Sequence, residues 1–583
     1  MSSRIPFPRL ADTPAGIISL LCLSLGASLP AHAQTAADRS EAARQADVIQ
    51  RQNQERIQRD IESAMPSGRA PSGVDTSGLV PKVDASAAGH KCHDIGKIVI
   101  SGAPHLPRMV RQDIIDRYAG GCLGVSEIEQ ILAEITKEYI SRGYVTTRAY
   151  LPQQDLSSGT LQILVIEGSI GKIDLQDGGH DSIRLGGVFP AEGDLLNLRD
   201  LEQGIDQANK LSSNNAQLDI QPGSKPGSSD VVIRNTPGNP LHASFSADNQ
   251  GSESTGQNQL GVTLSGDRLL GLNEFMLYTH RQAQPNDADR KFSNSDSFTF
   301  VVPIGYTTLS LSGSRSRYVS TIAAPSGLDL QFKGYSASDS YRLDRMMYRD
   351  QTTRLSMSGT LTMKDTKNYL AGEYLGVSSR PLTVFDLGTN LSTAFLGGAL
   401  GIDLGYSRGL DFGGALKDPD NLPDLAPRAQ FEKYTLGFNY NRPFRIGATD
   451  YAFSSQFVGQ RAVDTLYGSE QILIGGIYSV RGFVNNVLSG DHGYYMRNEL
   501  SALPVMRFGE QRLPLRLYAG VDFGKVSNRV PDVPSGRLVG MAVGVSVSWK
   551  GASFEVFNAR PISMPDFFQR EGSQTWLRLN YAL

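Results

Sequence analysis

The chain is 583 residues long, carries a formal net charge of -3 and is 40% hydrophobic, so it is long enough to form several domains. Proteins that bind nucleic acids or anionic membrane surfaces usually carry an excess of positive charge, and this chain has none. We therefore expect no nucleic-acid partner, and the class of the protein has to be inferred from the order of residues along the chain.

The first 33 residues have the pattern of a secretory signal peptide. Arg4 and Arg9 give a basic start, residues 17–29 form a short apolar core, and Ala31-His32-Ala33 is a small-x-small cleavage site. We leave residues 1–33 out of the fold and expect the mature chain to be exported.

Two cysteines remain once Cys22 is removed with the signal peptide. In an oxidising compartment Cys92 and Cys122 are expected to form a disulfide, with two free buried thiols as the alternative. The bond would close a loop of about 30 residues and stabilise the fold by roughly 3–4 kcal/mol in the chain-entropy model.

Residues 35–64 have the pattern of a helix that is polar on nearly every side. Its apolar residues are few: Val48, Ile49, Ile57 and Ile61. Such a helix cannot lie in a dry core, so it is either solvated or placed in a water-filled cavity. Its length, roughly 40 Å, would cross a lumen of bilayer height. Residues 65–91 follow as a linker punctuated by Pro and Gly.

Residues 92–168 and 169–237 form an internal repeat, each with the order strand, helix, helix, strand, strand. In the first unit, an apolar stripe at helical spacing follows Ser126-x-x-Glu129, which has the pattern of a capping box. In the second unit, the first helix is only weakly indicated, near Pro190–Leu196. We expect two small α+β domains.

From residue 240 to residue 583 helical periodicity ends and apolar residues alternate with polar or small ones. Between Val539 and Trp549 every second residue is apolar, and those between are Gly, Ala or Ser. A run of this length with no helix to cover either face favours a lipid-facing β-barrel with a wet interior. The barrel must close, because an open edge in lipid leaves backbone groups unpaired. A soluble β-sandwich is the alternative.

Sixteen antiparallel strands are predicted, an even number as in bacterial barrels. No stretch approaches the ~18 uncharged apolar residues of a transmembrane helix. The predicted strands are 241–250, 257–267, 273–282, 294–303, 306–315, 328–339, 351–363, 382–394, 397–407, 430–442, 449–460, 491–502, 513–524, 537–549, 552–559 and 574–583.

Two short motifs, 41 residues apart, combine a fixed cation with a fixed anion. Val480-Arg481-Gly482-Phe483 lies in a Gly-rich loop after the eleventh strand, and Gly520-Val521-Asp522-Phe523-Gly524 ends the thirteenth. Alternation turns Asp522 toward the lumen, where a carboxylate needs a partner or water. Gly520 and Gly524 leave space for a loop beside it, and an arginine such as Arg481 can bind a carboxylate through two parallel hydrogen bonds. The alternative is two separately solvated groups.

These motifs, in this order, resemble those of the outer-membrane transporters of two-partner secretion, within the Omp85 superfamily of POTRA-plus-barrel proteins. The resemblance covers nearly the whole mature chain. It is carried by Arg142-Gly143-Tyr144, residues 151–155 and Glu167-Gly168 in the first unit, Pro222-Gly223 and residues 228–230 in the second, and residues 248–251, 270–273, 475–483 and 520–524 in the barrel.

The resemblance implies a 16-stranded outer-membrane β-barrel over residues 240–583, a plug helix over 35–64 and periplasmic POTRA domains over 92–168 and 169–237. It implies a salt bridge between Arg481 and Asp522. The expected partner is one large β-helical exoprotein, such as a haemolysin, adhesin or contact-dependent toxin, captured by the POTRA domains and secreted without ATP. We expect a monomer surrounded by outer-membrane lipid, with no cofactor and no metal. A barrel-assembly insertase of the same superfamily is the alternative function.

An enzymatic function is supported by one pattern alone. Gly405-Tyr406-Ser407-Arg408-Gly409 matches the GxSxG nucleophile motif, which requires a strand-to-helix turn. Here it falls at the end of a predicted barrel strand, so we interpret it as a chance match and expect no catalytic residues. An outer-membrane hydrolase that uses Ser407 is the rival hypothesis.

Overall fold

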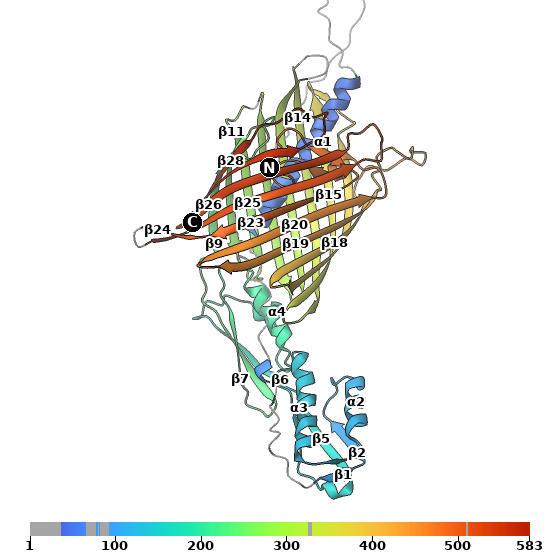
Figure 1. The fold of residues 1–583 in the computed structure, drawn as a ribbon, viewed down its shortest axis with the longest axis vertical. Coiled ribbons are helices and arrows are strands. Elements are labelled where there is room, and N and C mark those ends of the chain that lie inside the picture. Colours follow the sequence, from blue (N-terminus) through green and yellow to red (C-terminus); the bar gives the residue numbers. More distant parts are fainter. Residues whose placement is uncertain are drawn as a thin grey trace, which may run out of the picture.

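A computed structural model describes residues 36–65, 77–79, 81, 92–287, 289–323, 329–508 and 511–583. The expected signal peptide and most of the expected linker lie outside these residues. Figure 1 shows a β-barrel with two α+β units below it and a long helix, α1 (Ala36–Ala64), running through it. None of the described helices has the length and hydropathy needed to span a bilayer.

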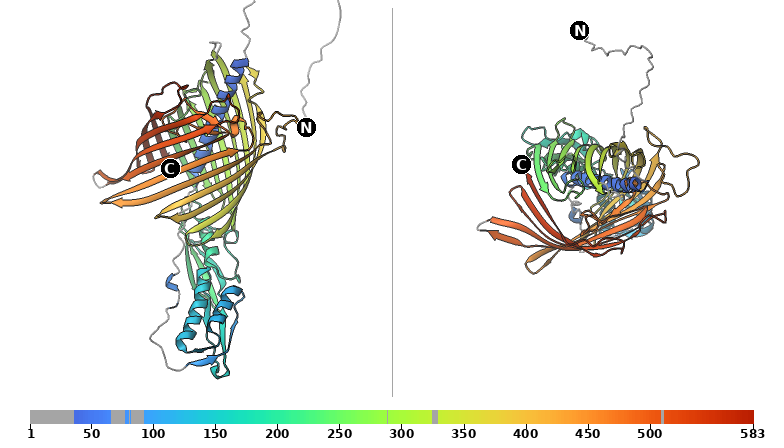
Figure 2. Two further views of the ribbon diagram at one scale, coloured as in Figure 1. Left: turned by 45° about the vertical axis from the view of Figure 1, so that its right-hand side comes forward. Right: turned by 90° about the horizontal axis from the view of Figure 1, so that it is seen from above.

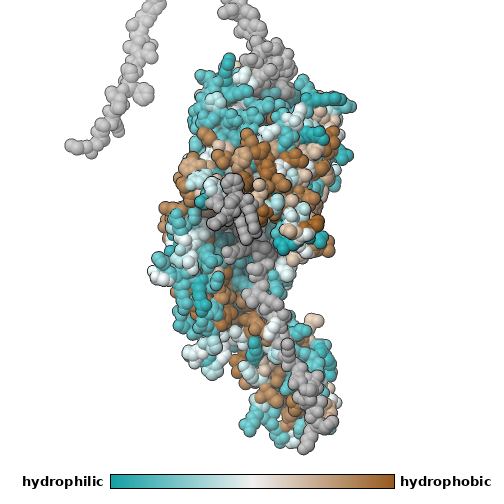
Figure 3. Space-filling model, turned by 60° about the vertical axis from the view of Figure 1, so that its left-hand side comes forward, coloured by the Kyte–Doolittle hydropathy of each residue, from teal (hydrophilic) through white to brown (hydrophobic). Residues whose placement is uncertain are grey.

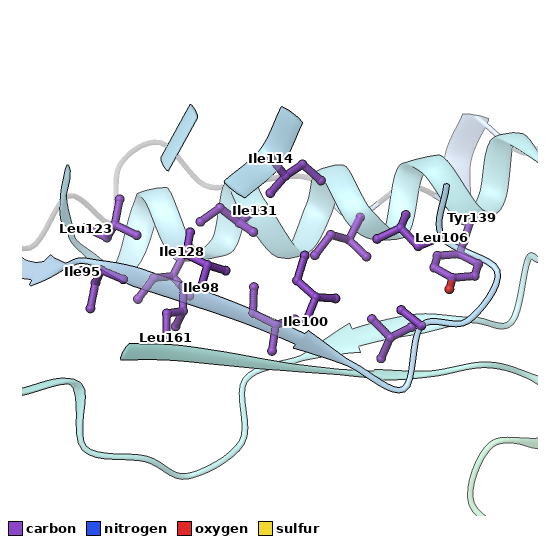
Figure 4. Packing of buried hydrophobic residues seen from close by; sticks show 14 residues of the cluster. Ile95, Ile98, Ile100, Leu106, Ile114, Leu123, Ile128, Ile131, Tyr139 and Leu161 are labelled. Carbon is purple, nitrogen blue, oxygen red and sulfur yellow. The ribbon is translucent and has the colours of Figure 1, made fainter. Parts of the chain in front are cut away.

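The first α+β unit packs two helices on a small sheet. The sheet has the order β2-β5-β4, with β2 parallel to β5, and β1 pairs with β3 beside it. Figure 4 shows Ile128, Ile131 and Tyr139 of α3 packed over Ile98 and Ile100 of β2. The elements are β1 (His93–Ile95), β2 (Lys97–Ser101), α2 (Arg108–Tyr118), β3 (Gly121–Leu123), α3 (Val125–Ser141), β4 (Arg148–Tyr150) and β5 (Thr160–Ile166).

The expected capping box of α3 is wrong, because the N-cap residue is Gly124, two residues before Ser126. The helix begins at Val125, before Ser126, and the carboxylate that caps it belongs to Glu127, whose Oε2 accepts a hydrogen bond from the Gly124 N–H at 2.9 Å. Glu129 therefore has no part in the cap, because the third helical residue is Glu127.

Cys92 and Cys122 form a disulfide in the structure, with Cα atoms 5.3 Å apart. It ties the start of the first unit to β3 across 30 residues. We expect replacement of both by serine to lower the free energy of unfolding of this unit by roughly 3–4 kcal/mol. Chemical denaturation of the wild-type and C92S/C122S proteins measures this difference. An unchanged denaturation midpoint would contradict it, and reduced wild-type protein should behave like the variant.

The second unit departs from the predicted repeat. It contains β6 (Ser169–Gln176), α4 (Leu198–Ala208), β7 (Gln217–Pro222) and β8 (Ser228–Arg234), in a sheet of order β6-β8-β7. The helix expected near Pro190–Leu196 is wrong. Leu195 bridges Ser169 there, and Gly193 has a positive φ of 89°. The segment pairs with the sheet edge, so its backbone cannot coil into a helix.

All sixteen predicted barrel strands are confirmed. The first strand, β9, pairs with the last, β28, from Asp248↔Arg578 to Ser244↔Ala582, which closes the barrel. Two short strands, β16 (Glu373–Tyr374) and β24 (Val505–Phe508), extend hairpins beyond the main ladder. The sixteen are β9 (Leu241–Asp248), β10 (Asn258–Asp267), β11 (Phe275–Gln284), β12 (Phe292–Ile304), β13 (Thr307–Ala323), β14 (Asp329–Arg349), β15 (Thr353–Leu370), β17 (Arg380–Phe395), β18 (Gly398–Leu410), β19 (Glu432–Ile446), β20 (Thr449–Ala462), β23 (His492–Leu503), β25 (Gln511–Ser527), β26 (Gly536–Trp549), β27 (Ala552–Ser563) and β28 (Gln574–Ala582).

The barrel wall has an apolar belt and a polar upper part. Figure 3 shows hydrophobic side chains gathered across the middle of the barrel and hydrophilic ones above them, away from the α+β units. The belt is expected where strands meet lipid. β13 and β14 are 17 and 21 residues long, longer than predicted. β13 continues past residue 315 at the end away from the α+β units, and β14 continues past residue 339 toward them, with both extensions paired to neighbouring strands.

Helix α1 lies inside the ring of strands, as the view from above in Figure 2 shows. Ala46 and Ile49 pack against Tyr318 and Phe332 of the wall in a dry cluster. Its other side borders a polar cavity of about 790 Å³. The C-terminal end of the helix packs as well, with Ile61 and Ala64 against Phe275 and Leu277 of β11. The expectation of a wet helix is therefore only half right: these segments are packed, and one side of the helix borders the cavity.

Candidate functional site

The loop that joins β20 to β23, residues 463–491, folds back into the barrel. We call it the lumenal loop. It contains a short helical turn (Gly468–Glu470) and a hairpin of β21 (Ile472–Ile474) and β22 (Leu488–Gly490). Val480 and Phe483 at its tip are fully buried in an apolar cluster with Val526 and Leu538 of the wall. Apolar packing alone thus holds the tip of the lumenal loop against the wall, independently of any ion pair.

Arg481 lies between these two anchors and binds Asp522 of β25 through three hydrogen bonds. Its Nε donates to Asp522 Oδ2 at 2.6 Å, its Nη2 donates to Oδ1 at 2.9 Å, and its backbone N–H donates to Oδ2 at 3.1 Å. The side-chain pair is the parallel two-bond geometry for which arginine is suited. We call this contact the Arg481–Asp522 latch.

The latch is buried, which differs from the wet lumen expected from the sequence. The Asp522 side chain is 0% exposed and that of Arg481 is 3% exposed. A buried pair is costly to break, by roughly 3–5 kcal/mol when one partner is removed, because the other charge stays without compensation. The structure thus favours a strong effect of substitution over the weak one that a solvated pair would give.

A second carboxylate, which sequence reasoning missed, completes the site. Glu499 of β23 accepts a hydrogen bond from Arg481 Nη1 at 2.9 Å, and it also binds Arg516 of β25. Arg516 in turn lies over the ring of Tyr518, with its Cζ 4.3 Å from the ring centroid. Arg516 also lies 3.8 Å from Glu555 of β27, so the network joins two arginines to three carboxylates.

Glycines make room for the loop against the wall. A Cβ at Gly520 would lie 2.5 Å from Arg481 Nη2, and one at Gly524 would lie 3.1 Å from Val480 Cγ2. Gly482 has a φ of +102°, a conformation that suits glycine. Gly540 of β26, which was not singled out, is tighter still: its Cβ would lie 1.8 Å from the Arg481 carbonyl oxygen.

Gly540→Val is expected to displace the loop tip and break the latch, because a Cβ there would overlap main-chain atoms that cannot rotate away. We expect the secretion that the sequence resemblance implies to fall in this variant as far as in a variant without Arg481. Gly359→Val is the matched control, since a Cβ at Gly359 meets only ordinary contacts at 3.8 Å from Phe385. Equal secretion by the two glycine variants would contradict the prediction.

A glutamate from another loop clamps the far side of the tip. Glu571, between β27 and β28, accepts hydrogen bonds from the backbone N–H groups of Val484, Asn485 and Asn486. Asn486 Nδ2 also donates to the Gln569 carbonyl at 2.6 Å. The tip is therefore held by the wall on one side and by this loop on the other.

Helix α1 is fastened to the wall by ion pairs at two levels. Arg380 of β17 donates to Asp47 at 2.8 Å, and Arg281 of β11 lies 3.0 Å from Asp60 and 2.6 Å from Asp248. The Arg380 and Arg281 side chains are 8% and 5% exposed, so both pairs are shielded from water.

The lumenal loop also contacts this helix. Arg51 of α1 donates to the Ser469 carbonyl at 3.4 Å, beside Glu470. Glu470 is buried and pairs with Lys364 and Lys433 of the wall at 2.6 and 3.1 Å. Helix, loop and wall therefore form one connected structure, in which moving one element breaks contacts of another.

Ser407 of the GxSxG pattern lies within β18, and its hydroxyl donates to Asp386 of the neighbouring strand. The motif is therefore in a regular strand, without the strand-to-helix turn that a nucleophile of this type requires.

Comparison with known proteins identifies relatives over nearly the whole chain. The model of the haemolysin secretion/activation protein family ShlB/FhaC/HecB matches residues 227–547, a ShlB-type POTRA domain model matches 93–168, and a second POTRA model matches 169–222. The outer membrane transporter CdiB of Dickeya dadantii is 36% identical over 78% of this chain and 80% of its own. That of Escherichia coli is 32% identical over 97% and 93%. The solved structure of CdiB from Escherichia coli superposes with a TM-score of 0.82 at 30% identity, over 95% of this chain and all of that one.

Proposed function

The chain belongs to the ShlB/FhaC/HecB family of haemolysin secretion/activation proteins, and we propose that its POTRA domains capture one large exoprotein in the periplasm for export. The protein is an outer-membrane pore of two-partner secretion. We propose domain boundaries at residues 92–168, 169–237 and 240–583. The matched models, at 93–168, 169–222 and 227–547, support this order of domains. A barrel-assembly function has no comparable support.

Capture by the POTRA domains is proposed to use the edges of their sheets. In the described part of the chain, β7 pairs with β8 alone, and β4 pairs with β5 alone. An extended client can add a strand to such an edge, where backbone hydrogen bonds give affinity with little demand on sequence. This mode suits an unfolded exoprotein that presents many similar segments.

In the resting pore, α1 acts as a plug and the Arg481–Asp522 latch holds the lumenal loop inside the barrel. The supporting observation is the two ion pairs that join the helix to the wall, Asp47 with Arg380 and Asp60 with Arg281. Transport then requires these contacts to open. The sequence has no phosphate-binding GxxxxGK[ST] loop, so folding of the exoprotein outside the cell is proposed to make its return unfavourable. One chain closes the barrel, so the pore is proposed to act as a monomer in outer-membrane lipid.

The observation that carries this function is a closed barrel with an internally latched loop, joined to two POTRA domains. Its test is a comparison of culture supernatants from cells with and without this gene. We expect one large exoprotein to disappear from the supernatant and to accumulate in the cells. A general loss of outer-membrane barrels with the supernatant unchanged would instead favour an insertase and contradict the proposal.

A further inference from the structure

The outer wall of the barrel carries a pocket of about 410 Å³ between β20, β23 and β25. Its lining includes Arg461, His492, Tyr494 and Lys525. Arg461 pairs across the strands with His492, and Tyr494 with Lys525. Directly opposed side chains begin about 4.5–5.5 Å apart, so the members of each pair are close, and all four side chains line the same pocket.

These side chains point away from the lumen. The residues that alternate with them, such as Val458 and Tyr495, line the polar cavity beside α1 inside the barrel. Lys525 and Arg461 are exposed. The pocket therefore opens onto the surroundings of the barrel and has no part in the latch or the plug.

The polar groups that the pocket offers are donors. Arg461 and Lys525 are cations, and Ser527 contributes a hydroxyl. The Ala462 N–H donates to His492 Nδ1 at 3.2 Å, so the neutral ring carries its proton on Nε2 and donates from there. Among the residues that the structure describes, no carboxylate lines the pocket. By contrast Arg315, on the same outer surface, is already bound by both oxygens of Asp339 at 2.9 Å.

The pocket lies at the edge of the apolar belt farthest from the POTRA domains. β9 starts directly after the second POTRA domain, and β20 is the eleventh main strand, so β20 also begins at that end and finishes at the opposite one. Toward the POTRA domains the outer face loses its charge, with Leu500 and Val521 about half exposed. In the orientation that the proposed function gives the barrel, this edge meets the headgroups of the outer leaflet.

We propose that this pocket binds the phosphate group of an anionic glycolipid in the outer leaflet. Two cations with converging N–H and O–H donors match the oxygens of a phosphate. Basic side chains clustered at a bilayer surface attract anionic headgroups, and an aromatic ring such as Tyr494 is favoured at headgroup level. The inference rests on the proposed function only for the orientation of the barrel.

The test uses the full-length protein in detergent, titrated with a phosphorylated glucosamine lipid and with the same lipid after removal of its phosphates. Native mass spectrometry measures the bound fraction. We expect the double variant R461Q/K525Q to bind the phosphorylated lipid roughly 30-fold more weakly than wild type. R315Q is the matched control and should bind as wild type does, and heat-modifiable migration on a gel verifies that each barrel is folded.

Three outcomes would overturn the inference. They are equal binding by R461Q/K525Q and wild type, equally tight binding of the dephosphorylated lipid, and binding of inorganic phosphate alone with the same affinity, which would assign the pocket to a soluble anion. Secretion is measured in parallel. If wild type binds the lipid but secretes no exoprotein, the proposed function is wrong and the lipid site is supported. If wild type secretes the exoprotein but does not bind the lipid, only the lipid site is rejected.

Discussion

Arg481→Ala is expected to reduce secretion of the exoprotein roughly tenfold or more while the barrel still assembles. The substitution leaves Asp522 buried without its partner, a change that costs roughly 3–5 kcal/mol in a dry site. Asp522→Ala should have a similar effect, because Arg481 then keeps only Glu499. The apolar anchors Val480 and Phe483 remain, so folding of the barrel is expected to survive. Secreted and cell-associated exoprotein are measured by immunoblot.

The matched control is Arg445→Ala, which removes an arginine from an exposed pair with Asp450 at the POTRA end of the barrel. Exposed pairs contribute little, so secretion should stay at the wild-type level. Wild-type secretion by both Arg481→Ala and Asp522→Ala would show that the latch has no role in transport.

Loss of the two carboxylates that fasten α1 should increase the conductance of the pore several-fold. In Asp47→Ala/Asp60→Ala the buried arginines of the wall, Arg380 and Arg281, lose their partners on the helix. The helix then loses both of its ion pairs with the wall, so it is held more weakly and should spend more time outside the lumen. Deletion of residues 35–64 should give the largest conductance. Planar-bilayer recordings measure both.

Glu62→Ala is the control for the helix, because the Glu62 side chain is 51% exposed and its pair with Arg59 lies within α1 itself. Its conductance should match that of wild type. If the deletion of residues 35–64 leaves the conductance unchanged, the helix does not close the pore.

The barrel was predictable because alternation has a physical cause that each strand expresses on its own. Apolar residues must face lipid, so the face of Asp522 follows from its neighbours Val521 and Phe523. The length of each strand is less clearly indicated by the sequence. β13 continues past residue 315 and β14 past residue 339, where apolar and polar residues no longer alternate regularly and pairing with the neighbouring strands keeps the chain extended.

Predicting the other residues of the site would have required knowing which strands are neighbours and in what register they pair. Glu499 lies opposite Gly520, and Gly540 lies opposite Asp522. Neither residue is marked by its local sequence, but aligning strands twelve to fourteen around Asp522 would have found both. Glu571 could not be found this way, because it belongs to a loop whose path over the lumenal loop is set by tertiary packing.

The helix expected near Pro190–Leu196 failed for a related reason. Local propensity there is weak, and the segment gains more by bonding to β6, where the Ile170 N–H donates to the Asp194 carbonyl at 2.9 Å. Tertiary pairing therefore decided the conformation, as it often does for short segments.

The most direct test of the account is a double-mutant cycle on secretion with Arg481→Ala, Asp522→Ala and both together. If the two residues act as one latch, each single change already breaks the contact. The double variant should therefore secrete at least as much exoprotein as the single variant that secretes less. Losses that multiply, so that the double variant falls as far as two independent effects predict, would contradict the latch.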